Sequence, residues 1–138
     1  MYRKGEQNDG DLLFLTDLAA NRYLARQEGK KRLGLIRGDK KIPPGIELPL
    51  APGHTPGLQG IAVNTAKGTA IVGTDIAHVA SSYQTDIPSA IITDMTARMK
   101  SYDKIRPTAS TPELLFPGHD LSLLENYPRV AEDVSRPV

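Results

Sequence analysis

The sequence predicts an α/β protein of the α+β class, in which most strands come in one block. Hydrophobic residues make up 39% of the chain and charged residues 24%, which is typical of a globular protein. Apolar residues recur at helical spacing near the start and again after the middle, and short apolar runs bounded by Gly and Pro lie between them. We therefore expect the order helix, strands, helix, strand, with mostly antiparallel neighbours in the sheet.

The first element is a helix expected over Asp11–Glu28. Asp9 or Asp11 could cap its start, and Gly29 is well placed to end it. Its apolar face would comprise Leu12, Leu15, Leu18, Ala19 and Tyr23. Residues 1–10 are polar and are expected to be irregular.

Short strands are expected to follow this helix. A turn at Gly38-Asp39 ends the first strand, Pro49 marks the second as an edge or strand end, and Ala66-Lys67-Gly68 has the length of a hairpin turn. The strands are expected at Leu33–Arg37, Ile46–Leu50, Leu58–Asn64 and Thr69–Thr74, with a last one at Glu113–Phe116.

A second helix is expected over Ser89–Ile105. Ile91, Met95, Met99 and Tyr102 recur at helical spacing, and we interpret this stripe as core packing. Residues 128–138 contain Pro128 and Pro137 and are expected to be irregular. Residues 1–138 are expected to form one domain, since neither a repeat nor a low-complexity linker interrupts the sequence.

Composition argues against several classes of function. A formal net charge of +1 is too small for a nucleic-acid footprint, and the cluster Lys30–Arg32 is better explained as a solvated helix end. The absence of cysteine excludes disulfides and thiolate metal sites. The N-terminus does not read as a secretory signal, and the sequence has no apolar segment of membrane-spanning length, so a cytoplasmic protein is expected.

The chain has three histidines, His54, His78 and His119, and each follows a predicted strand in a segment rich in Gly or Pro. Functional side chains favour such loops, because a rigid strand positions them. His54 lies in Pro52–Gly57 (PGHTPG), where two prolines and two glycines constrain the backbone around one imidazole. From this segment alone, a turn histidine without a ligand role is equally plausible.

Asp75 and His119 follow the same pattern. Asp75 comes directly after an apolar strand, where it could simply cap the next turn, and His119 follows Pro117-Gly118. Imidazole and carboxylate are the ligands expected for Zn²⁺ and neighbouring divalent ions. A carboxylate has two oxygens and can hold two metals, so His54 and His119 could serve one metal each with Asp75 between them.

Three segments in this order, PGHTPG at Pro52–Gly57, GTD at Gly73–Asp75 and PGHD at Pro117–Asp120, resemble the metallo-β-lactamase superfamily. The branch that looks most similar is the N-acyl-homoserine-lactone lactonases. The resemblance runs from about Leu33 to about Asp120 and also includes Ile42–Ile46 (IPPGI) and Asp86–Pro88 (DIP).

The resemblance implies the C-terminal half of an αββα sandwich with two Zn²⁺ or other divalent ions at one edge. It implies that His54 binds one metal, that Asp75 bridges both, and that His119 binds the second. Lactonases carry a tyrosine three residues after the aspartate, and here that position is His78. The resemblance therefore implies catalytic roles for Asp75 and His78, in which the imidazole donates a hydrogen bond or acts as an acid without binding metal.

The family's His-x-His-x-Asp-His motif is absent, and the chain has no histidine before His54. Each metal would keep about two ligands, whereas a catalytic zinc site normally has three. The sheet would also lack the other half of the sandwich. We therefore expect low activity from this chain alone, together with self-association or a partner that supplies the missing half.

The leading hypothesis is a metal-dependent hydrolase that opens a lactone or a related ester. A non-catalytic fragment that serves as an interaction or dimerisation module is the alternative from another class, and metal content would separate the two. A thioester hydrolase of the glyoxalase II type is a third possibility, although the Gly-Asp-x-Leu-Phe segment of that branch is missing.

Overall fold

A computed structural model describes residues 18–30, 32–132 and 134–137. The chain divides into two compact units, Met1–Arg37 and Gly38–Val138. In the first unit the expected helix is present as α2 (Leu18–Gly29), ending at the predicted glycine. The expected helix start at residues 11–17 and the irregular residues 1–10 lie outside the described residues.

The prediction of a strand at Leu33–Arg37 was wrong, because residues 32–37 have no regular secondary structure. The first strand is instead β1 (Lys40–Ile42), which pairs antiparallel with β2 (Ile46–Leu48). The turn between them contains Gly45 at φ +73° and sets Ile42 opposite Ile46. The pairing of β1 with β2 therefore begins beside this turn. The apolar residues before Gly38 have no strand partner in the part of the chain that the structure describes.

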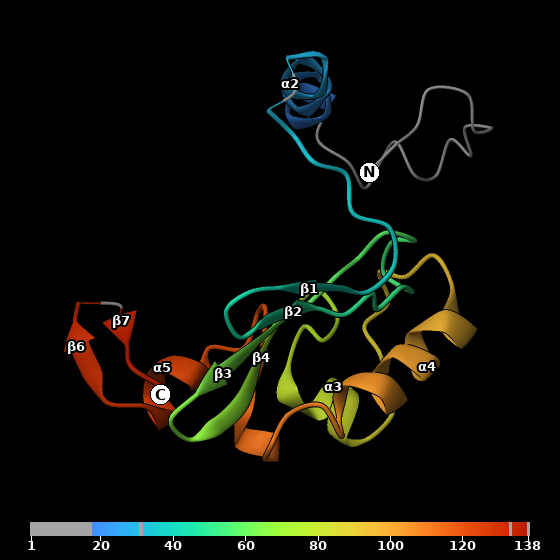
Figure 1. Cartoon of the computed structure of the whole chain (residues 1–138). Coiled ribbons are helices and arrows are strands. Elements are labelled where there is room, and N and C mark those ends of the chain that lie inside the picture. Colours follow the sequence, from blue (N-terminus) through green and yellow to red (C-terminus); the bar gives the residue numbers. More distant parts are fainter. Residues whose placement is uncertain (1–17, 31, 133, 138) are drawn as a thin grey trace. The chain divides into compact units, whose positions relative to one another are not determined.

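The second unit is built on a five-stranded sheet with the order β1-β2-β3-β4-β5 (Figure 1). β3 (Ile61–Thr65) and β4 (Gly68–Thr74) form the expected hairpin, so the predicted antiparallel arrangement is confirmed from β1 to β4. β5 (Leu115–Pro117) pairs parallel with β4. Its direction follows from the helical crossover that separates it from β4 in the sequence.

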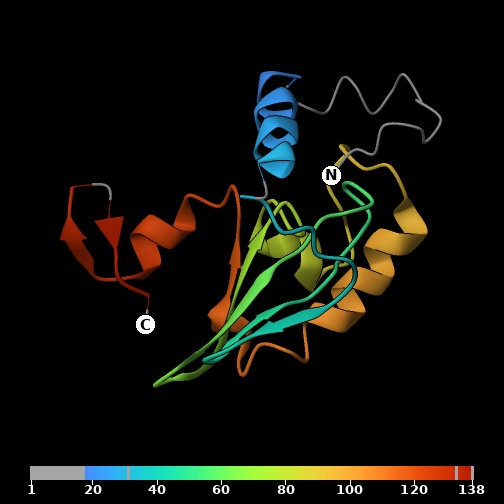
Figure 2. The ribbon, with the colours of Figure 1, turned by 45° about the horizontal axis from the view of Figure 1, so that its top comes forward.

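The helices of this crossover cover one face of the sheet. α3 (Ala80–Gln84), which the sequence did not predict, and α4 (Met95–Ile105) flank the sheet in Figure 2. The main core lies between them and the strands, and its members include Ala62, Ile71, Ile76, Tyr83, Tyr102, Ile105 and Leu115. A smaller cluster contains Ala70, Leu114 and Phe116, with Leu123 of α5 (Ser122–Asn126) and Tyr127 against it.

The expected helix over Ser89–Ile105 is shorter than predicted. α4 begins at Met95, because the Asp94 side chain accepts a hydrogen bond from Ala97 N and caps the helix. Met99 and Tyr102 pack in the core as predicted, but Ile91 is 50% exposed and Met95 is 52% exposed. The inward face of α4 is instead formed by Arg98, Ser101, Tyr102 and Ile105.

The C-terminal residues were expected to be irregular but contain a small hairpin of β6 (Arg129–Ala131) and β7 (Val134–Ser135). A backbone hydrogen bond from Arg136 N to Pro128 O closes it, and the preceding Tyr127 packs against Phe116. Pro128 and Pro137 flank the paired residues and so do not interrupt the ladder. Among the described residues, the helices are too short or too polar to cross a membrane.

Candidate metal centre

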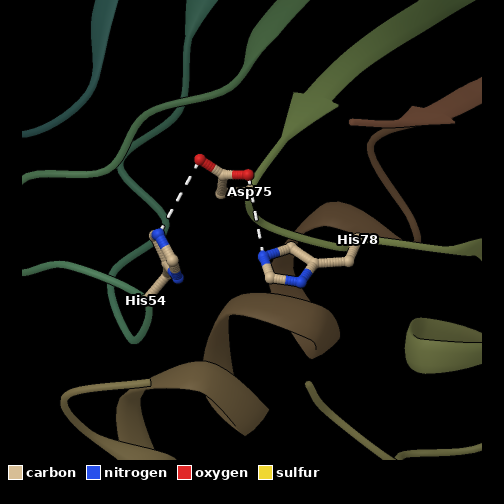
Figure 3. Close-up of side chains that lie close together, drawn as sticks. All are labelled: His54, Asp75 and His78. Atoms are coloured by element: carbon tan, nitrogen blue, oxygen red, sulfur yellow. Dashed lines mark ion pairs between the residues drawn. The ribbon is translucent and has the colours of Figure 1, made fainter. Parts of the chain in front are cut away.

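Four polar side chains from three loops meet beyond the end of β4. Asp75 directly follows β4, His78 lies three residues later, His54 comes from the loop after β2, and His119 comes from the loop after β5. Figure 3 shows the Asp75 carboxylate between the rings of His54 and His78. The three residues that the sequence selected as ligands therefore lie together, and His78 lies with them.

The loops after β4 and β5 are held against each other by backbone hydrogen bonds. Gly118 N donates to Thr74 O and to Ala77 O, both at 3.0 Å, and His119 N donates to His78 O at 2.9 Å. A Cβ at Gly118 would lie 2.7 Å from Thr74 O, so a side chain would force the loops apart. These contacts bring His78 and His119 to one place although 41 positions separate them in the sequence.

Thr74 turns the chain sharply just before Asp75. It adopts φ 47°, in the left-handed region that β-branched residues rarely enter. Such backbone strain persists only where the surrounding structure enforces it, and here the bonds from Gly118 do so. The strained residue is thus the one that aims the Asp75 side chain away from the strand.

The His54 loop is fixed by α4 and the segment before it. Gly53 has φ +133°, and a Cβ there would lie 2.5 Å from Arg98 Cα. Its carbonyl accepts hydrogen bonds from Thr93 N at 2.7 Å and Asp94 N at 3.1 Å. These contacts explain the glycine in PGHTPG as a requirement for close approach.

One ring nitrogen of His54 is already used. His54 Nδ1 lies 2.7 Å from Ile91 O, and because a carbonyl only accepts, Nδ1 carries the proton and donates. The lone pair of the neutral ring is then on Nε2, which lies 3.7 Å from Asp75 Oδ2. A backbone carbonyl that fixes the tautomer in this way is the usual support of a metal-binding histidine.

The other two imidazoles approach Asp75 Oδ1. His119 Nε2 is hydrogen-bonded to it at 2.7 Å, and His78 Nε2 lies 3.6 Å from it. The three rings meet edge to face, with centroid separations of 5.5 Å for His54–His78 and 4.9 Å for His78–His119. The imidazoles therefore surround one carboxylate, as expected for a metal site whose aspartate is shared.

Arg98 supports the cluster through the backbone carbonyls of Asp75 and Ile76, and it is not among the site residues predicted from the sequence. Arg98 is 1% exposed, and its guanidinium donates to Asp75 O at 2.6 Å and to Ile76 O. Burial lowers the pKa of Arg98, while Tyr102 and Asp75 oppose that effect. Arg98 lies between Met95 and Tyr102 on the expected apolar stripe of the helix. A charged residue at a core-facing position was the sequence signal that could have identified Arg98 as a functional residue.

The residues present fit a divalent ion. His54, Asp75 and His78 each offer a ligand atom, and these atoms all lie within 4.8 Å of one another. Nitrogen and oxygen donors of this kind suit Zn²⁺ and its neighbours in the first transition row. Burial is the largest effect on His78 and lowers its pKa, so the ring is neutral at pH 7 and keeps a lone pair for a metal.

The curated proteins that this chain resembles are lactonases, and each match covers only part of the two chains. No protein-family model matches the chain. An N-acyl homoserine lactonase from a Bacillus species is 28% identical over 89 residues, which is 63% of this chain and 35% of that protein. The lactonase AiiA from Bacillus thuringiensis subsp. kurstaki is 26% identical over the same length. The chain thus spans about a third of the length of these relatives.

Solved structures agree on the fold. An N-acyl homoserine lactone hydrolase with N-hexanoyl-L-homoserine bound at its catalytic metal centre has a TM-score of 0.61 and 23% identity. The match covers 70% of this chain and 39% of that one. AidC, a dizinc quorum-quenching lactonase, has a TM-score of 0.55 and 18% identity, over 84% of this chain and 44% of that one. The α+β fold is that of these metallo-β-lactamase-like neighbours.

Proposed function

We propose that this chain forms part of the active site of a metal-dependent hydrolase. It is a partial-length relative of the metallo-β-lactamase-like lactonases. The observation that carries the proposal is the convergence of His54, His78 and His119 on the single carboxylate of Asp75. Three separate loops would not deliver these side chains to one point for packing alone, because three polar rings and a carboxylate gain little from mutual burial.

We assign His54, Asp75 and His119 as metal ligands, with Asp75 between the other two. His54 would use Nε2, because Nδ1 donates to Ile91 O. His119 would exchange its hydrogen bond to Asp75 for a bond to metal through the same Nε2. A zinc or similar ion held there would supply Lewis acidity and generate a nucleophile from water at neutral pH.

The substrate class we propose is a lactone or a related ester. It rests on the relatives, which are lactonases by name, and on a neighbour that holds a ring-opened homoserine product at its metal centre. In this chain, the groups around the cluster hold and orient the proposed metal ligands. Gly118 and Arg98 fix the backbone around Asp75, and Ile91 fixes the His54 ring.

Zinc-dependent hydrolysis of an N-acyl homoserine lactone by the purified chain tests this function. We expect slow, zinc-dependent ring opening, at least about tenfold below the longer lactonases that it resembles, because ligands and their supports set metal affinity and water activation. Asp75→Ala should abolish it, whereas Asp103→Ala, an exposed carboxylate on α4, should not. A chain that takes up no zinc would favour the non-catalytic interaction module.

A further inference from the structure

His78 has a buried nitrogen without a partner. Nε2 is shielded from solvent and has no hydrogen-bond partner among the described residues. At 3.6 Å from Asp75 Oδ1 it is too far for a hydrogen bond. A buried polar atom left unpaired destabilises a fold, and here an unsatisfied lone pair or N–H lies at the centre of the cluster.

The separations around Asp75 match those of ligands that share an ion. Donor atoms bound tetrahedrally at about 2.0–2.2 Å lie about 3.3–3.6 Å apart. The distances are 3.7 Å from Asp75 Oδ2 to His54 Nε2 and 3.6 Å from Asp75 Oδ1 to His78 Nε2. One ligand atom from each of the three residues lies within 4.8 Å of the others, so small side-chain movements would bring all three around one ion. His119 differs, because its Nε2 is at the hydrogen-bond distance of 2.7 Å.

Burial argues against a substrate-binding role for His78. Its side chain is only 19% exposed, and its Nε2 faces Asp75. A substrate would have to displace neighbouring groups to reach this nitrogen, but an ion between His54, Asp75 and His78 would reach it directly. The expectation that His78 lines the site without binding metal does not explain why its buried Nε2 has no hydrogen-bond partner among the described residues.

We propose that His78 is a metal ligand, and that His54, Asp75 and His78 together hold one divalent ion with three protein donors. Three donors and an open position are what a catalytic zinc site uses. The chain would then complete one ion site from its own residues. This inference rests on the proposed metal centre but adds a ligand that the sequence resemblance does not assign.

Cobalt spectroscopy with His78→Cys gives a direct readout. The chain has no cysteine, so a thiolate-to-cobalt charge-transfer band in the near ultraviolet would arise only from position 78. We expect this band in His78→Cys loaded with Co²⁺ and its absence in the wild-type chain. Because the thiolate can still bind the ion, the variant remains informative even if His78→Ala folds poorly.

Zinc affinity, measured by competition with a chromophoric chelator, gives the second readout. His78→Ala should weaken binding by at least about tenfold, whereas Val79→Ala, the exposed neighbour, should not. Wild-type affinity in His78→Ala together with no band in His78→Cys would overturn this inference. If Asp75→Ala still abolished binding, the proposed metal centre would stand without His78; if Asp75→Ala bound normally, both would fail.

Discussion

At the scale of single residues, the site depends on a few positions that admit no side chain. Gly53 is the strictest of them, because its φ is +133° and a Cβ would meet Arg98 Cα at 2.5 Å. The contact is with backbone of α4, which cannot yield as a flexible side chain would. The glycine therefore decides both where His54 lies and how closely its loop approaches the helix.

We predict that Gly53→Ala lowers the free energy of unfolding by about 2 kcal/mol or more, since it combines a forbidden φ with an overlap. Gly34→Ala is the matched control, because a Cβ there meets nothing within 4 Å. Urea denaturation measures both. Equal midpoints for the two variants would show that the loop relaxes without cost.

Arg98 is the second residue with a predictable effect. Its guanidinium bonds to the carbonyls of Asp75 and Ile76, so Arg98→Met should loosen the backbone that carries the carboxylate. We expect a loss of zinc affinity of roughly tenfold, the usual effect of removing support behind a ligand. Lys100→Met, an exposed cation on the same helix, is the control. Unchanged affinity in Arg98→Met would limit Arg98 to packing.

At the scale of elements, Asp120 joins the starts of two short helices. Its Oδ2 accepts from Ala80 N at 2.8 Å at the start of α3, and its Oδ1 accepts from Ser122 N at 3.1 Å and Ser122 Oγ at 2.6 Å. These bonds, led by that of the Ser122 side chain, lower the pKa of Asp120 below its ordinary 3.8. The ionised carboxylate is therefore the form that the fold stabilises.

The sign of the resulting pH dependence follows from the lowered pKa. Asp120 stabilises the folded chain fully above its unfolded value of 3.8, and this contribution is lost as the pH falls below it. We predict that unfolding free energy drops less between pH 6 and pH 3 in Asp120→Asn than in the wild type. The control is Glu125→Gln on α5. A parallel drop in Asp120→Asn would refute the capping role.

The sequence predicted the elements whose signals are local. β2, β3 and β4 fall within a few residues of their expected positions, because Pro49 and Ala66–Gly68 mark strand ends by their own backbone chemistry. The strand at Leu33–Arg37 failed because an apolar run says nothing of its partner, and the turn at Gly45 pairs β2 with residues 40–42 instead. α3 was missed because a helix of five residues has no readable period.

The cluster was predictable in its members and not in its arrangement. Gly and Pro around His54 and His119 indicated fixed loops, and the structure places both rings against Asp75. Arg98 was missed because its role depends on which face of α4 turns inward. The buried, unpartnered nitrogen of His78 depends on three loops at once, and a sequence pattern carries no such information.

At the scale of the whole molecule, one face of the sheet keeps apolar side chains at its surface. Ile61 and Val72 are register partners on neighbouring strands and are 39% and 43% exposed. Phe116, which pairs with Val72, is covered by Leu123 of α5 and by Tyr127. The exposed apolar surface of Ile61 and Val72 lies beside this covered part of the sheet. Apolar sheet faces of this kind favour association.

We predict that the chain self-associates in solution and that Ile61→Lys shifts it towards the monomer, because a charge on this face would be desolvated in an interface. Ile87→Lys is the control, since Ile87 is 70% exposed and lies outside the sheet. Light scattering coupled to size exclusion gives the mass. A monomeric wild-type chain with a cooperative melt would contradict this prediction.

The central claim is that the side chains around Asp75 hold a divalent ion. Anomalous diffraction at the zinc edge from zinc-loaded crystals tests it most directly. We expect a peak about 2.0–2.2 Å from an Asp75 carboxylate oxygen and from His54 Nε2, the bond lengths of zinc to oxygen and nitrogen donors. A zinc peak at other residues only, or none between His54 and Asp75, would contradict the account.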